Sequence, residues 1–153
     1  AQTHGLWQVR ESIPLAQAEA GLNVKHDIAV PISAMAAFVA DTGAALAAAF
    51  PGVRMITFGH LGDSNLHYNV QASEGVDPAA FLQQHEAAIN TLVLDAVHRF
   101  GGSISAEHGI GQLKRNILPR YQSPVALGMM RAIKQALDPQ NIMNPGKVLP
   151  DQA

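Results

Sequence analysis

The sequence predicts an α+β fold: a ferredoxin-like βαββαβ sheet with its helices on one face and helical extensions at both ends. Two observations support this. Strand-like and helix-like segments alternate in that order, and a turn-rich link joins the two middle strands. The 153 residues are 48% hydrophobic, which is enough for one core but not for two. We therefore expect a single domain over residues 1–153.

The helices are predicted from apolar residues that recur at helical spacing. They are expected to cover residues 13–20, 34–49, 78–100 and 124–137. Ser33 and Ser123 are the expected N-caps of the second and fourth of these helices. The last helix is expected to bury the apolar side formed by Val125, Met129, Ile133 and Leu137.

Four strand-like segments lie between the helices, at residues 22–30, 53–60, 66–71 and 103–107. The link at residues 61–65 makes the middle two a hairpin. Alternation along the strands gathers polar side chains on the face away from the helices, namely Lys25, His67, Asn69 and Glu107. In an ideal sheet of this type the end of the last strand lies opposite the hairpin. Either that strand starts later than drawn, or the topology departs from ideal.

Composition excludes several classes of function. The net charge of -2 and the pI of about 6.4 leave no basic stripe for nucleic acid, whereas a small anionic substrate needs only local positive charge. Because the chain has no cysteine, nitrogen and oxygen must hold any metal. No apolar run approaches the roughly 18 residues of a spanning helix, so we expect no membrane span. The abrupt start without Met suggests a fragment of a longer protein.

The densest chemical signal is the pair His60 and His67, followed about 40 residues later by Glu107. Two imidazoles on adjoining arms of a hairpin can face one point, and a carboxylate from a third segment completes a site with an open position. That donor set suits Zn²⁺ or Mn²⁺ acting on a substrate. On spacing alone, a polar hairpin rim without a metal is an equal alternative.

Three further residues have open roles at this stage. His108 could be a fourth ligand, a general base or part of a glycine-rich turn. Arg10 and Lys25 could each anchor a substrate carboxylate, or each could be an ordinary solvated charge.

Several segments together resemble the C-terminal half of the FAD-linked oxidases, a family of flavin enzymes that act on D-lactate, D-2-hydroxyglutarate or glycolate. The segments are LWQVRE (6–11), KHDI (25–28), FGHLGDSNLH (58–67), AEHGIG (106–111) with Lys114, DP (138–139) and NPGK (144–147). Motifs in this order cover nearly the whole chain. The resemblance favours a metal site over the alternative, in which His60 and His67 are polar residues at the end of the hairpin and bind no metal.

By position, the resemblance implies that His60, His67 and Glu107 bind a divalent metal, usually zinc. It implies that His108 is the catalytic base, which takes the hydroxyl proton while hydride leaves the α-carbon for FAD. The implied activity is oxidation of a D-2-hydroxy acid by a flavin-dependent dehydrogenase. A non-catalytic metal-binding or assembly module and a metal-dependent hydrolase are the alternatives.

The resemblance also implies substrate contacts for Arg10, Lys25 and Asn65, and a flavin contact for Asn144. FAD would be held mainly by a domain absent from this chain, so the fragment is expected to be inactive alone. Pro14 stands where relatives acting on 2-hydroxyglutarate tend to have Thr, which favours a monocarboxylate, and Ser64 stands where many relatives have Gly. A homo-oligomer is possible. We expect a cytoplasmic location, with peripheral membrane association or the mitochondrial matrix as alternatives.

Overall fold

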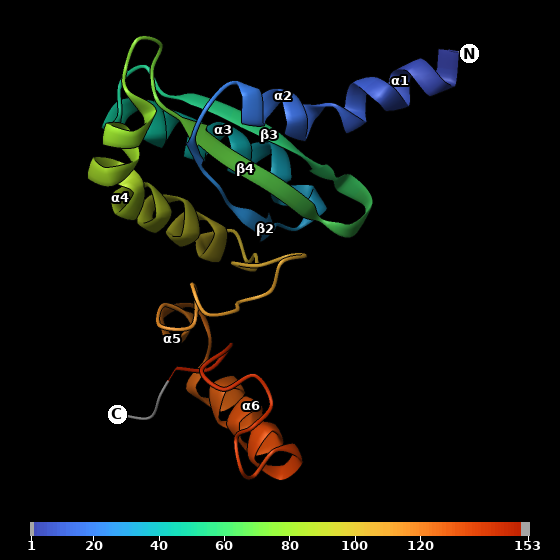
Figure 1. Cartoon of the computed structure of the whole chain (residues 1–153), viewed down its shortest axis with the longest axis vertical. Coiled ribbons are helices and arrows are strands. Elements are labelled where there is room, and N and C mark those ends of the chain that lie inside the picture. The colour runs from blue at the N-terminus through green and yellow to red at the C-terminus, as the bar shows by residue number, and fades with distance from the viewer. Residues whose placement is uncertain (1, 151–153) are drawn as a thin grey trace.

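The computed structural model describes residues 2–150, which form an α+β structure around one antiparallel sheet (Figure 1). In chain order the elements are α1 (Gln2–Glu11), α2 (Ile13–Glu19), β1 (Asn23–Val24), β2 (Asp27–Ala29), α3 (Ile32–Ala49), β3 (Arg54–His60), the 3₁₀ helix η1 (Leu61–Asp63), β4 (Asn65–Gln71), α4 (Pro78–Arg99), α5 (Leu118–Tyr121) and α6 (Pro124–Leu137). The predicted fold class is confirmed.

The β3–β4 hairpin makes up most of the sheet. β3 pairs with β4 along its whole length, from Arg54 opposite Gln71 to His60 opposite Asn65. β1 and β2 pair with the other side of β4. All of these pairs are antiparallel and the helices α3 and α4 follow β2 and β4, so the structure matches the predicted order as far as the second long helix.

The predicted strand at residues 103–107 is wrong. Only Ser103 pairs with the sheet, through an isolated antiparallel bridge to Ala29. Beyond Ser103 the backbone N–H groups of residues 106–108 turn to the carboxylate of Asp27 instead of continuing a ladder. In an ideal sheet, the end of the last strand would have placed Glu107 opposite the hairpin. Because the pairing stops at Ser103, the chain can instead fold back over the hairpin.

The core lies between the sheet and the two long helices α3 and α4. β4 alternates as predicted: Leu66, Tyr68 and Val70 are buried against the helices. Phe38 of α3 meets the ring of Tyr68 edge to face, at a centroid distance of 5.5 Å. The opposite face of β4 is thereby left for polar side chains.

The start of α3 differs from the prediction. Pro31, not Ser33, is the N-cap residue, and the Ala34 N–H already donates to the Pro31 carbonyl oxygen at 2.8 Å. Ser33 therefore lies inside the first turn. With 18 residues and a mean hydropathy of 1.6, α3 also meets the length and composition of a membrane-spanning helix. The expectation that no apolar run reaches this length is thus wrong, although Phe38 and Leu46 of α3 are core residues.

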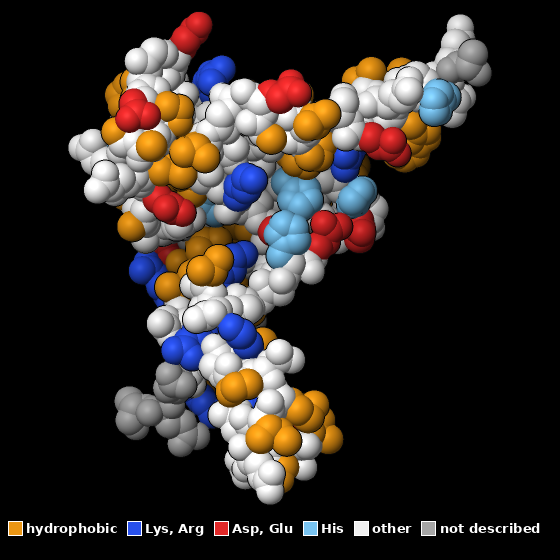
Figure 2. Space-filling model, in the orientation of Figure 1, with side chains coloured by type: hydrophobic (Ala, Val, Ile, Leu, Met, Phe, Trp, Pro, Cys, Tyr) orange, Lys and Arg blue, Asp and Glu red, His pale blue; other side chains and the backbone are white. Residues whose placement is uncertain are grey.

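The apolar side of α6 is exposed, contrary to the prediction. Ser123 does cap this helix, accepting from the Ala126 N–H at 3.1 Å. However, Figures 1 and 2 show α6 apart from the sheet, with hydrophobic side chains on its surface. We call its four exposed large hydrophobic residues the α6 stripe: Val125, Met129, Ile133 and Leu137, which are 73%, 63%, 58% and 75% exposed. Leu127, on a different side of the helix, is the residue that α6 buries.

Candidate metal and substrate site

Asp27 organises the loop that carries Glu107 and His108. Its buried carboxylate accepts backbone N–H bonds from Ala106 at 3.1 Å, Glu107 at 3.0 Å and His108 at 2.8 Å. Desolvation raises the pKa of this carboxyl, but the three N–H donors and the nearby His108 outweigh it, so the pKa lies below its usual value. A charged Asp27 therefore fixes the loop against β2.

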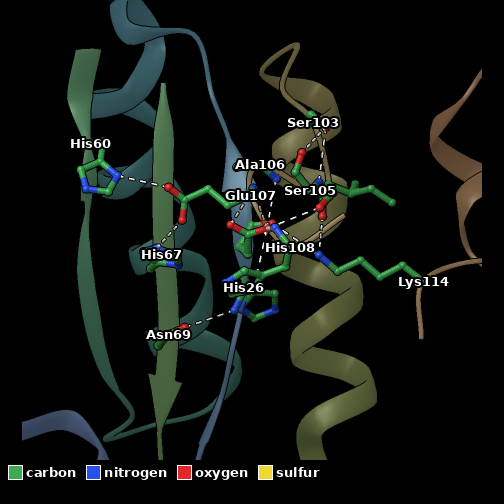
Figure 3. Close-up of polar contacts among 12 residues, drawn as sticks. His26, His60, His67, Asn69, Ser103, Ser105, Ala106, Glu107, His108 and Lys114 are labelled. Carbon is green, nitrogen blue, oxygen red and sulfur yellow. Dashed lines mark hydrogen bonds and ion pairs between the residues drawn. The ribbon is translucent and has the colours of Figure 1, made fainter. Parts of the chain in front are cut away.

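Glu107 lies between two histidines of the hairpin (Figure 3). Its Oε1 is 3.3 Å from Nδ1 of His60, and its Oε2 is 3.4 Å from Nε2 of His67. A carboxylate oxygen and a bare imidazole nitrogen both present lone pairs, so each contact needs a proton or a cation between the two atoms. The three residues predicted as metal ligands are thus brought together.

These three side chains fit a divalent metal by donor chemistry, because two imidazole nitrogens and one carboxylate are typical of catalytic zinc sites. A second grouping overlaps with theirs: ligand atoms of Asp27, His67 and His108 lie within 4.8 Å of one another. We favour the set with Glu107, because Asp27 Oδ2 already accepts three backbone N–H bonds. His67 belongs to both sets.

Arg10 of α1 reaches the outer side of His60. Its guanidinium lies 3.4 Å from His60 Nε2 and from the Gly59 carbonyl oxygen, and it stacks 5.6 Å from the Phe58 ring centroid. Phe58 in turn lies against His67, with ring centroids 4.9 Å apart. Arg10 therefore lies beside the predicted ligand His60.

His108 lies over the same site. Its ring centroid is 5.7 Å from that of His67, and its Nδ1 is 3.9 Å from Asp27 Oδ2. The side chain is 70% exposed, so a ligand can reach the ring. A solvent-accessible imidazole next to a fixed carboxylate has the surroundings of a general base.

A cavity of about 610 Å³ opens beside these groups. Its lining includes two cations, Lys25 and Lys114, and the site residues His67, Glu107 and His108. Burial lowers the pKa of Lys114, an effect that the Asp27 charge opposes. Predicted residue Lys25 thus faces the cavity.

Two residues of the predicted set lie elsewhere. Asn65 is 3% exposed, next to His60 across the hairpin but outside the lining of the cavity. Asn144 is exposed in the tail, at a left-handed φ of 49°. The tail is tied to the loop after the site, because the Val148 N–H donates to the Gly111 carbonyl oxygen at 2.8 Å.

A buried polar network that the sequence did not reveal supports the floor of the cavity. The His26 backbone N–H donates to Asn69 Oδ1 at 3.1 Å, and Asn69 Nδ2 donates to Gln17 Oε1 at 3.0 Å. The His26 ring donates from Nδ1 to the Tyr68 carbonyl oxygen at 2.7 Å. The alternation of β4 predicted that Asn69 would face the site, but no local pattern distinguished Gln17.

The burial of His26 predicts that the stability of the protein falls in acid. Burial lowers the pKa of this imidazole from 6.5 to about 4, so folding is linked to the neutral ring. Without metal, we expect the free energy of unfolding to fall by up to roughly 3 kcal/mol as the pH drops from 6.5 to 4. Urea unfolding at several pH values across this range, in the presence of a metal chelator, will measure the slope of the free energy of unfolding against pH. His26→Asn should flatten it and His4→Asn, at an exposed position, should not; an unchanged slope in His26→Asn would contradict this account.

The fold brings a candidate divalent-metal site together with the cationic side chains of Arg10, Lys25 and Lys114. The family of FAD linked oxidases, C-terminal domain, matches residues 1–148, and the chain belongs to this family. It is similar to D-2-hydroxyglutarate dehydrogenases of Xanthomonas citri pv. viticola (43% identity over 97% of the chain and 31% of the relative) and Stutzerimonas stutzeri (37%, 96% and 31%). A mitochondrial D-2-hydroxyglutarate dehydrogenase of Arabidopsis thaliana is 37% identical over 97% of the chain and 25% of its own length. The chain thus spans about a third or less of these relatives.

Proposed function

We propose that this chain is the metal- and substrate-binding part of a flavin-dependent dehydrogenase that oxidises a D-2-hydroxy acid to the 2-oxo acid. The observation that carries the proposal is the placement of Glu107 between His60 and His67, beside a cavity that contains Lys25 and His108. Membership of the FAD-linked oxidase family and the names of the relatives support it.

His60, His67 and Glu107 would hold the metal, Zn²⁺ or Mn²⁺. Such an ion, when bound, supplies Lewis-acid polarisation of the substrate hydroxyl oxygen. His108 takes the hydroxyl proton, and its backbone N–H bond to Asp27 keeps it in position for this step. Arg10 and Lys25 bind the substrate carboxylate and orient the α-carbon.

FAD, when bound, would supply the acceptor for the hydride of the substrate α-carbon. Asn144 offers an exposed amide to the flavin, and the hydrogen bond from Val148 to Gly111 holds its segment near the site loop. The flavin domain is the partner that we assign to the α6 stripe, because the relatives have more than two thirds of their length outside the matched region.

The relatives' names favour 2-hydroxyglutarate as the substrate, whereas Pro14 favours a monocarboxylate. The test is a chimera of this chain with the flavin-binding part of the Xanthomonas citri relative. We expect D-2-hydroxyglutarate to bleach the flavin absorbance, His108→Ala to prevent this, and the chain alone to be inactive. A chimera that holds flavin and zinc but is reduced by no D-2-hydroxy acid would exclude the proposal, and a metal-dependent hydrolase would act without flavin.

A further inference from the structure

Gln17 of α2 is a buried side chain with an unused donor at the cavity. The residue is 6% exposed, lines the cavity and uses its Oε1 to accept from Asn69. Within residues 2–150, no hydrogen-bond partner is found for its Nε2. An unpaired buried amide donor costs on the order of 1–3 kcal/mol, so it calls for an acceptor.

The hydrogen-bond network fixes which end of the amide is free. A backbone N–H can only donate, so the Asn69 atom that faces His26 must be Oδ1. Asn69 therefore donates from Nδ2, and the Gln17 atom that receives this bond must be Oε1. It follows that the unpaired atom of Gln17 is the NH₂ group, which binds acceptors only.

The free NH₂ group lies at a distance from the metal ligands. His67 and Asn69 share one face of β4, and residues two apart on a strand are separated by about 7 Å. His67 contacts Glu107, whereas Asn69 contacts Gln17. A ligand that is held at Glu107 and also reaches Gln17 must carry a second oxygen acceptor well beyond its 2-hydroxy-carboxylate end.

We propose that Gln17 is a specificity-determining residue, whose side-chain NH₂ binds the distal carboxylate of a dicarboxylic 2-hydroxy acid. Lys25, which binds the 2-hydroxy-carboxylate end in the proposed function, lines the same cavity as Gln17, so both ends of such an acid would lie in one cavity. This inference rests on the proposed function and narrows its substrate to the dicarboxylate class. A monocarboxylate such as D-lactate would leave the Gln17 donor unpaired.

The test is ¹H–¹⁵N NMR of the 153-residue chain with one equivalent of Zn²⁺, titrated with D-2-hydroxyglutarate or D-lactate. The Gln17 side-chain signals are assigned by their absence in Gln17→Glu. We expect D-2-hydroxyglutarate to shift these signals and the His67 region, and D-lactate to shift the His67 region alone. Gln17→Glu should weaken D-2-hydroxyglutarate binding at least tenfold and D-lactate binding less than threefold, with Gln84→Glu on α4 as the matched control.

Three results would overturn the inference, and they differ in whether the proposed function survives. If both acids shift the His67 region while the Gln17 signals stay in place, the specificity role is wrong and the proposed function survives. The same holds if Gln17→Glu weakens both acids equally, which indicates a structural role for Gln17. If neither acid shifts any site residue, the proposed function fails together with the inference.

Discussion

Replacing Asp27 by Asn is expected to lower the free energy of unfolding by about 4 kcal/mol and to release the site loop. The variant keeps the size of the side chain but loses the charge that accepts N–H bonds from Ala106, Glu107 and His108. Hydrogen bonds to a charged buried group contribute about 1.5–3 kcal/mol each, and the new amide would direct N–H groups at donors. Urea unfolding gives the energy, and amide hydrogen exchange at residues 106–108 reports the loop.

The lowered pKa of the Asp27 carboxyl predicts that the free energy of unfolding depends on pH. The pKa of Asp27 in the folded protein lies below its unfolded value of about 3.9. The contribution of Asp27 to the free energy of unfolding is therefore fully present above about pH 3.9 and is lost as the pH falls through the folded pKa. Asp63→Asn, at an exposed turn position, is the matched control and should change stability by less than about 0.5 kcal/mol. Protection at residues 106–108 that survives Asp27→Asn would refute the anchoring role.

Gly59→Ala is expected to be similarly damaging, at about 4 kcal/mol, because the hairpin has no room for a side chain there. A Cβ at this position would lie 2.2 Å from the Asn65 carbonyl oxygen, which is backbone and cannot rotate away. The strands must separate where His60 and Asn65 pair, and His60 would then move from Glu107. The temperature of thermal unfolding and the affinity for zinc should both be lower in Gly59→Ala than in the wild-type chain.

Gly62→Ala provides the comparison for this prediction. It adds the same methyl group three residues later, in η1, where nothing lies within 4 Å of the new Cβ. Neither glycine has a positive φ, so space and not backbone conformation distinguishes them. If the two variants unfold at the same temperature, close packing at Gly59 does not hold the hairpin.

The parts of the fold that depend on local pattern were predictable. Helical spacing located α2, α4 and α6, and alternation along β4 placed Leu66, Tyr68 and His67 on their correct faces. The ends were less accurate. Pro31 rather than Ser33 is the N-cap residue of α3, because a proline carbonyl oxygen can accept the first helical hydrogen bond as well as any other.

Features that depend on distant partners were not predictable. The last strand stops after Ser103 because residues 106–108 bind a carboxylate some 80 positions earlier, and no local pattern records that contact. The apolar period of α6 identified its stripe correctly, but period alone does not say whether a protein surface covers it. Likewise, nothing in the sequence of α2 marked Gln17 as the neighbour of Asn69.

The most direct test of the metal and substrate site is the zinc content of the purified chain by elemental analysis, compared among single variants. The account predicts about one Zn²⁺ per wild-type chain, its loss in His60→Ala and His67→Ala, and its retention in His108→Ala. Loss in His108→Ala with retention in His60→Ala would instead assign the ion to Asp27, His67 and His108. A wild-type chain that binds no zinc after incubation with the ion would contradict the central claim.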